Sequence, residues 1–141
     1  MAKPRVPLPP IEAAVGYAAD ARGNGIAYVR AGAASAEQLA RVPFRVRRHA
    51  QLQGHEIGYA AVRAVLRALR EWNVSRIRIS LEDARLVDEL TGRCDVASEI
   101  VLPYVRLRCA LNAFDAAAVV VGGDADLTQR ARAEIAMHAA A

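Results

Sequence analysis

The chain has 141 residues, of which 54% are hydrophobic and 24% are charged, and this composition predicts a packed domain and excludes disorder throughout. No apolar run approaches the roughly 20 residues needed to cross a bilayer, and the start of the chain lacks the apolar segment of a signal peptide, so we expect a cytoplasmic protein. The formal net charge of +4 permits attraction to polyanions such as nucleic acids.

The chain opens with a proline-rich segment, MAKPRVPLPP, in which four of ten residues are proline. Proline lacks a backbone N–H group and favours extended conformations. Residues 1–10 are therefore predicted to be a flexible arm, followed by a single domain at residues 11–141.

Two strands and a turn are predicted next. Residues 11–20 are rich in small and β-compatible side chains, residues 26–30 form a short apolar run, and the sequence RGNG at 22–25 contains the Asn-Gly pair that is typical of a tight hairpin. After an Ala/Gly/Ser stretch at 31–36, residues 42–49 alternate between apolar and basic side chains, which predicts a half-buried third strand.

Helices and strands alternate in the rest of the chain. Apolar side chains recur at helical spacing in three segments, a short helix is closed by a Thr-Gly stop, and two further segments have strand patterns. This order predicts a mixed sheet with helices on its faces. The predicted helices cover 56–72, 84–90, 100–113 and 126–140, and the predicted strands cover 77–83 and 116–121.

The stretch from Asp83 to Phe114 resembles type 1 ribonucleases H. Its segments DARLVDELTG and LPYVRLR and the residue Phe114 are similar to DSQLVVNQLTG, LPYYEEAR and the closing Phe of that family, and with the preceding elements the similarity covers about residues 12–140. The resemblance implies an α/β fold with a five-stranded mixed sheet, three antiparallel strands followed by βα units, and helices on both faces. It implies nucleic acid, an RNA/DNA hybrid or duplex, as the partner. In active members it implies two Mg²⁺ or Mn²⁺ ions held by four carboxylates, which cleave the RNA strand.

The family places its first carboxylate at the end of the first strand. Alignment with the DAS..GIG motif of retroelement relatives puts Asp20 at this position. Alignment with the DGASRGN motif of the family puts Ala18 there instead. The second carboxylate opens the central helix, where an ungapped alignment places Gly58 and the nearest acid is Glu56. Glu56 is equally explained as a charge that the helix dipole favours.

The third family carboxylate matches Asp83, which lies three residues before a Leu-Val pair, although a one-residue insertion would select Glu82. For the fourth, a shortened loop selects Asp126, whereas an ungapped alignment places Arg130. Asp83 and Asp126 are also typical helix N-caps. An arginine at the fourth position would abolish two-metal binding, because it brings a fixed cation to the site of the ion.

Full nuclease activity needs Asp20, Glu56, Asp83 and Asp126 to converge as catalytic and metal-binding residues, and most of these assignments require a gap or slip in the alignment. We therefore predict a ribonuclease-H-like nucleic-acid-binding domain with weak or lost nuclease activity. The alternatives are an active two-metal ribonuclease H and a protein interaction module, which forms a homodimer or docks onto another chain.

Arginines on two elements are predicted to contact phosphates. One group lies on the third strand, and the other forms a stripe on the first helix because its members are four and three residues apart. A histidine falls near the Asn with which the family contacts the hybrid. The predicted nucleic-acid-binding set is Arg45, Arg47, Arg48, His55, Arg63, Arg67 and Arg70.

Overall fold

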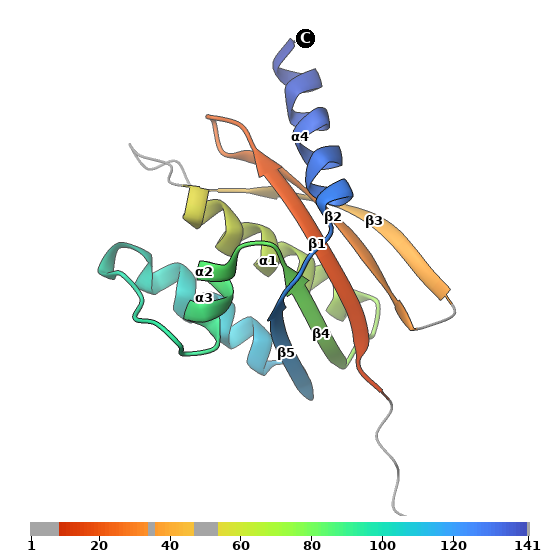
Figure 1. Ribbon diagram of the computed structural model, residues 1–141, viewed down its shortest axis with the longest axis vertical. Helices are drawn as coiled ribbons and strands as arrows, with labels where there is room; N and C mark the ends of the chain where they lie inside the picture. Colours follow the sequence, from red (N-terminus) through yellow and green to blue (C-terminus); the bar gives the residue numbers. More distant parts are fainter. Residues whose placement is uncertain (1–8, 34–35, 47–53, 141) are drawn as a thin grey trace, which may run out of the picture.

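A computed structural model describes residues 9–33, 36–46 and 54–140 (Figure 1). Five strands form one sheet in the order β3-β2-β1-β4-β5. The first three strands pair antiparallel, whereas β4 is parallel to β1 and β5 is parallel to β4. The predicted five-stranded mixed sheet is thus confirmed. Its strands are β1 (Ile11–Ala19), β2 (Asn24–Ala33), β3 (Ala36–Arg45), β4 (Arg76–Leu81) and β5 (Ala116–Val121).

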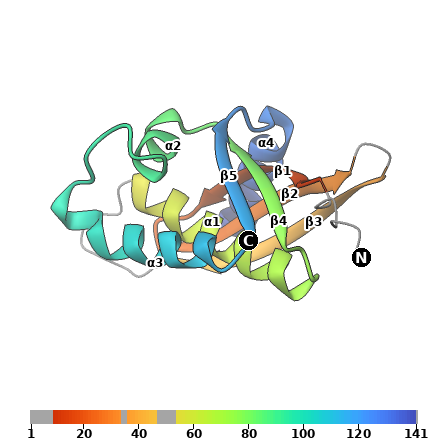
Figure 2. The same cartoon turned by 90° about the horizontal axis from the view of Figure 1, so that it is seen from below.

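Helices cover both faces of the sheet. The first helix packs across β1, β2 and β3 and against the third helix, while the last helix crosses β1 and β2 on the opposite face (Figure 2). In the described part of the chain, no helix is long and apolar enough to span a membrane. The helices are α1 (Gly54–Glu71), α2 (Ala84–Leu90), α3 (Val101–Asn112) and α4 (Ala125–Ala140), with a 3₁₀ turn, η1 (Ser98–Ile100), before α3.

The hairpin between β1 and β2 closes differently from the prediction. Asn24 and Gly25 already belong to β2, and the residue with positive φ in the turn is Gly23, at 88°. The Asp20 carboxylate accepts hydrogen bonds from the backbone N–H groups of Arg22 and Asn24. Because the Asp20 side chain closes the turn, the residue that adopts the left-handed backbone conformation is Gly23, one position before the Asn-Gly pair.

The second and third strands extend further than the sequence predicts. β2 continues to Ala33 and β3 begins at Ala36, with these two residues paired. Small side chains have little strand preference of their own, so the antiparallel pairing of the two backbones is what includes residues 31–33 in β2 and residue 36 in β3. As a result β3 ends at Arg45, and residues 47–49 of the predicted strand lie outside the described residues.

Alternation along β1 places its side chains on two different faces. Val15 and Tyr17 point towards α1, whereas Gly16 faces α4. A Cβ atom at Gly16 would lie 2.5 Å from the backbone carbon of Leu127 in α4. The α4 backbone therefore lies directly on β1, which is possible only because residue 16 is glycine.

Candidate functional site

The carboxyl ends of β1 and β4 lie side by side and position the candidate site. Their parallel register pairs Val15 with Leu81, so two residues further along Tyr17 lies beside Asp83. Burial, followed by the nearby charges of Asp83 and Glu82, raises the pKa of Tyr17 to about 12. A neutral phenol, rather than Ala18 or Asp20, is thus the neighbour of Asp83 on β1.

Gly58 of α1 faces the same point from above the sheet. A Cβ atom there would lie 2.7 Å from Tyr17 Oη and 2.9 Å from Leu86 Cδ2. Real Cβ atoms essentially never approach another atom this closely. The position that ungapped alignment gives to the second family carboxylate therefore has no room for a side chain while Tyr17 is in place.

The two acids at the end of β4 diverge. Asp83 is the N-cap of α2, and its Oδ1 accepts a hydrogen bond from the backbone N–H of Leu86 at 3.2 Å. Glu82 accepts a hydrogen bond from the Thr128 hydroxyl of α4, on the other face of the sheet. Successive residues of an extended chain point to opposite sides, so Glu82 and Asp83 do not form one pair of ligands.

Asp20 lies in the β1–β2 turn, past the end of β1. Its Oδ1 accepts hydrogen bonds from Asn24 N at 3.0 Å and Arg22 N at 2.9 Å. These hydrogen bonds, that from Asn24 foremost, hold the pKa of Asp20 below its ordinary value. The structure therefore gives this carboxylate a turn-closing role, three residues beyond Tyr17 along the chain.

Glu56 lies in the first turn of α1 and is half-buried. Its Oε2 is buried, and no described residue donates a hydrogen bond to it. The positive end of the helix dipole favours a carboxylate here. Of the predicted acids, Glu56 is the one with a buried carboxylate oxygen to which no described residue donates.

Asp126 is exposed in the first turn of α4. Its backbone N–H donates to Asp124 Oδ1 at 3.0 Å, and the other carboxylate oxygen of Asp124 accepts from Arg30.

Arg130, the alternative at the fourth carboxylate position, lies over the ring of Tyr28 at 6.0 Å from its centroid. The α4 residue that contacts an acid just after β4 is Thr128, which donates to Glu82 and which the sequence did not single out.

A two-metal centre needs several carboxylates that converge on shared ions. Among the residues that the structure describes, no group of three or more His, Cys, Asp or Glu side chains is arranged to hold a metal ion. Such a group is missing for two reasons. Tyr17, not a carboxylate, lies beside Asp83, and Tyr17 leaves no space for a side chain at Gly58. The described residues therefore do not fit the Mg²⁺ or Mn²⁺ pair that the family resemblance implies.

The predicted arginines separate into two groups. Arg63, Arg67 and Arg70 are exposed on the outer side of α1, as the spacing predicts. Arg45 is exposed on the other face of the sheet, because it shares strand parity with Arg41, whose Nε donates to Glu134 of α4. Two further predicted positions, 47 and 48, lie outside the described residues, as does the side chain of the predicted histidine at 55.

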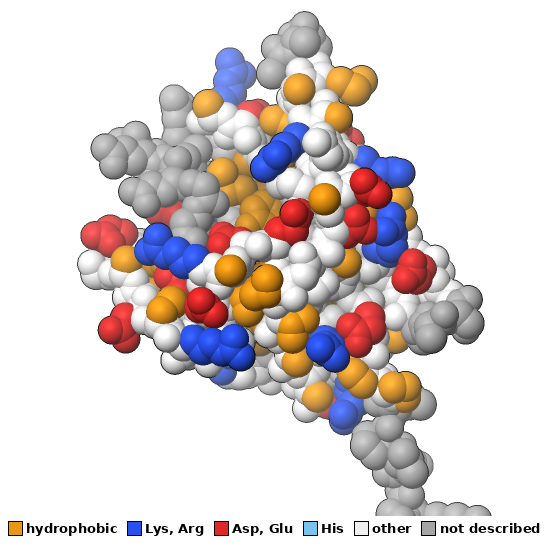
Figure 3. Space-filling view, viewed as in Figure 1, with side chains coloured by type: hydrophobic (Ala, Val, Ile, Leu, Met, Phe, Trp, Pro, Cys, Tyr) orange, Lys and Arg blue, Asp and Glu red, His pale blue; other side chains and the backbone are white. Residues whose placement is uncertain are grey.

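Charge on the α4 face is mixed. Figure 3 shows acidic and basic side chains intermixed there, and two of its arginines have acidic partners, since Arg30 pairs with Asp124 and Arg41 pairs with Glu134. Neighbouring carboxylates weaken the attraction of a phosphate to an arginine. The α1 stripe is therefore the better candidate for a nucleic-acid interface.

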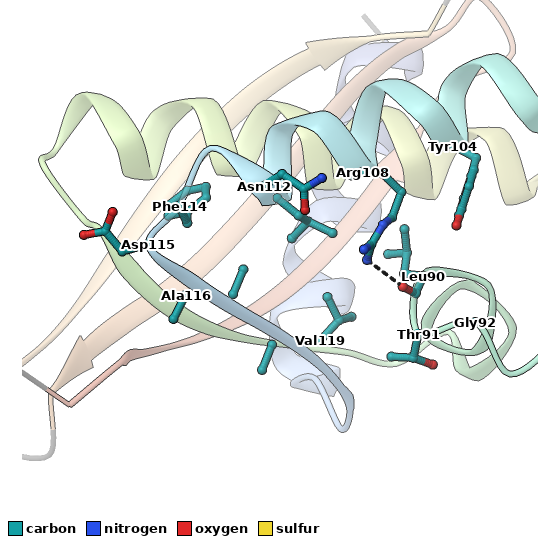
Figure 4. A pocket seen from close by; sticks show the side chains of 13 residues that line it. Leu90, Thr91, Gly92, Tyr104, Arg108, Asn112, Phe114, Asp115, Ala116 and Val119 are labelled. Atoms are coloured by element: carbon teal, nitrogen blue, oxygen red, sulfur yellow. Dashed lines mark hydrogen bonds between the residues drawn. The ribbon is translucent and has the colours of Figure 1, made fainter. Parts of the chain in front are cut away.

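A groove of about 620 Å³ lies away from these acids, between the end of α2, α3 and β5 (Figure 4). Alanines of β5 line one side, and Arg108 crosses the other, where its Nη1 donates to the Leu90 carbonyl oxygen at 2.9 Å. Among the described residues that line the groove, Asp115 is the one acid, and they include no group of three or more His, Cys, Asp or Glu side chains that could hold a metal ion.

Comparison with known proteins identifies the fold. Ribonuclease H1 from the halophilic archaeon Halobacterium salinarum NRC-1 superposes with a TM-score of 0.69 at 19% identity, over 89% of this chain and 93% of that chain. The N-terminal ribonuclease H domain of a Mycobacterium tuberculosis protein gives 0.66 at 11% identity, over 86% and 94%. LC11-RNase H1, solved in complex with an RNA/DNA hybrid, gives 0.61 at 10% identity, over 87% and 91%.

No protein-family model and no curated protein matches the sequence. The class is defined by the sheet order, the helices on both faces and these superpositions: the chain has the ribonuclease H fold.

Proposed function

We propose that this chain is a ribonuclease-H-like domain that binds nucleic acid, as an RNA/DNA hybrid or duplex, and has weak or lost nuclease activity. The observation that carries the proposal is that Tyr17, instead of a carboxylate, lies beside Asp83 at the ends of the two central parallel strands. A tyrosine in this place removes one anionic ligand from a centre whose chemistry depends on oxygen anions.

The active alternative requires Asp20, Glu56 and Asp126 to reach ions bound at Asp83. Asp20 is engaged by the backbone of its turn, and Asp126 is exposed on α4. Glu56, with its buried Oε2, is the acid that most favours this alternative. One carboxylate together with Asp83 is too few for a two-metal site, so we rank the active enzyme second.

Two observations support nucleic-acid binding. One structurally similar protein, LC11-RNase H1, is in complex with an RNA/DNA hybrid. In this chain, Arg63, Arg67 and Arg70 present three exposed guanidinium groups along one side of α1. Guanidinium groups form bidentate hydrogen bonds with phosphate and keep their charge at all physiological pH values. We infer that this stripe follows a phosphate backbone.

The test measures binding of a labelled RNA/DNA hybrid at several salt concentrations. We compare the wild type with the triple variant Arg63→Ala, Arg67→Ala, Arg70→Ala. Each lost phosphate contact lowers the slope of log K against log [salt] by about 0.9. The stripe variant should therefore lose about 3 from the slope and bind more weakly than the wild type.

A second triple variant provides the matched control, because it removes the same charge from elsewhere on the surface: Arg78→Ala, Arg93→Ala, Arg132→Ala. The slope of log K against log [salt] for this control should differ from the wild-type slope by no more than about 0.9, which is the change expected from one phosphate contact. Equal losses in both variants would contradict a specific role for the α1 stripe. Mg²⁺- or Mn²⁺-dependent cleavage of the hybrid, abolished by Asp83→Asn, would establish the active alternative instead.

Self-association through β5 is a second candidate function, favoured by the contrast between the two sheet edges. β3 carries Glu37, Arg41 and Pro43, residue types that protect an edge from pairing, whereas β5 consists of three alanines and three valines. Sedimentation equilibrium tests this candidate. A wild-type dimer that Ala118→Lys converts to a monomer, with Gln38→Lys on β3 without effect, would support it, and a wild-type monomer would exclude it at the concentrations used.

A further inference from the structure

We propose that Tyr17 and Gly58 are a matched pair, in which the tyrosine closes the point where metal ligands would meet and the glycine makes room for the tyrosine. The inference deepens the proposed function and rests on it, because it names the residues that account for weak or lost nuclease activity. It predicts that a carboxylate at position 17 or at position 58 alone does not create a cation site. Carboxylates at both positions open such a site beside Asp83.

Tyr17 lies on the α1 face of β1, two residues beyond the last pair of β1 with β4, Val15 with Leu81, and the charge of Asp83 acts on its phenol. Gly58 is buried in the second turn of α1, directly over Tyr17. Side chains at positions 17, 58 and 83 would therefore converge from two strands and one helix.

The space between Tyr17 and Gly58 is too small for a side chain at position 58. The atoms near a Cβ at Gly58 are Tyr17 Oη at 2.7 Å, Leu86 Cδ2 at 2.9 Å and Tyr17 Cζ at 3.4 Å. Two of these three atoms belong to the phenol, so a shorter residue at position 17 removes most of the obstruction. The remaining atom is the end of a leucine side chain, which can move by rotation.

Carboxylates at positions 17 and 58 would give the site beside Asp83 the ligands that a divalent cation needs. The double substitution Tyr17→Asp with Gly58→Glu would place two carboxylates next to Asp83. Oxygen ligands of this type suit Mg²⁺ and Mn²⁺. Without an ion the three anions repel one another, so the variant should bind a divalent cation and be stabilised by it.

The matched pair is tested without any metal by a double-mutant cycle on thermal unfolding. In the wild-type background, Gly58→Ala should lower Tm by roughly 3–10 °C, because the added methyl group overpacks the contact with Tyr17. In the Tyr17→Ala background the same change should raise Tm, because alanine favours a helix more than glycine does. A rise of Tm in both backgrounds would overturn the pairing.

Cation binding is tested with Mn²⁺ by calorimetry and by Tm with and without EDTA. The double variant Tyr17→Asp, Gly58→Glu should bind Mn²⁺ and gain several degrees in Tm, whereas Tyr17→Asp alone and the wild type should not. A folded double variant without Mn²⁺ binding would overturn the closed-site inference. Specific Mn²⁺ binding by the wild type would instead overturn the loss of the metal centre, and absent hybrid binding would overturn the proposed function without affecting the Tm cycle.

Discussion

The two faces of the sheet are held by different forces. On the α1 face, buried aliphatic side chains such as Leu66 and Ile79 form a continuous core, and its buried charged residue, Glu89, accepts a hydrogen bond from Tyr59 Oη at 2.8 Å. On the α4 face, the helix is held by a close backbone contact at Gly16 and by polar pairs such as Arg41 with Glu134.

This contrast indicates what each face can tolerate. Apolar burial stabilises in proportion to area and responds little to salt or pH, whereas exposed ion pairs respond to both. The candidate site lies where the two faces meet, since Asp83 turns towards α1 and Glu82 turns towards α4. Changes on each face should therefore produce distinguishable effects.

The largest effect is expected in the core. Leu66 is 1% exposed within the core cluster, so Leu66→Ala should lower the free energy of unfolding by about 2–5 kcal/mol, through lost burial and the cavity left behind. Urea denaturation at low and high salt measures it, and the loss should be the same at both. Leu39→Ala, at a site 43% exposed, is the control and should change stability by less than about 1 kcal/mol.

Next in size is the contact between β1 and α4. Gly16→Ala should cost about 1–3 kcal/mol, because the new methyl group meets the backbone of Leu127 and displaces the helix. Hydrogen exchange should accelerate in α4 and stay slow in α1. Gly122→Ala, whose Cβ would lie 3.4 Å from Ser80 Cβ, is the matched control. Uniform acceleration across both helices would show that the two faces are not independent.

At the meeting point of the faces, Asp83 acts as a helix cap. Asp83→Ala should lower the free energy of unfolding by about 0.5–2 kcal/mol, whereas Asp83→Asn should be nearly neutral because asparagine caps a helix equally well. Denaturant titrations of the two variants measure the difference. A large loss in Asp83→Asn would mean that the charge itself matters, as it would in a metal site.

The smallest effect concerns the Arg41–Glu134 pair, in which Glu134 is 21% exposed and Arg41 is 46% exposed. The hydrogen bond from Arg41 holds the pKa of Glu134 below its ordinary value of 4.5. The pair therefore stabilises the fold above pH 4.5 by the small amount expected of a solvent-exposed ion pair, and this contribution disappears as the pH falls through the lowered pKa.

Glu134→Gln tests this pH dependence. The variant should be less stable than the wild type at pH 7 and low salt, and the difference should vanish in acid and shrink at high salt. Stability curves from pH 2 to pH 7 give the comparison. A difference that persists at pH 2 would assign the effect to packing, which would make the α4 face resemble the α1 face.

Local signals determined much of the secondary structure. The predicted bounds of α2 and β5 agree with the structure at every residue, because α2 has an N-cap and a Thr-Gly stop, and β5 is an uninterrupted run of Ala and Val. The stripe of Arg63, Arg67 and Arg70 was predicted because helical spacing alone sets it. The start of β3 was predicted wrongly, because residues 36–41, AEQLAR, have no clear strand pattern and join β3 through their pairing with β2.

By itself the sequence determined the fold class, which follows from the order of elements along the chain, and the apolar side of α1 and the place of Asp83 just after β4, which depend on neighbours within a few residues. The tertiary structure decided which residue meets Asp83. The parallel pairing of β1 with β4 brings Tyr17 there, and α1 places Gly58 over it. Pairing register and the space above a side chain arise from contacts between distant segments, so neither composition nor spacing contains them.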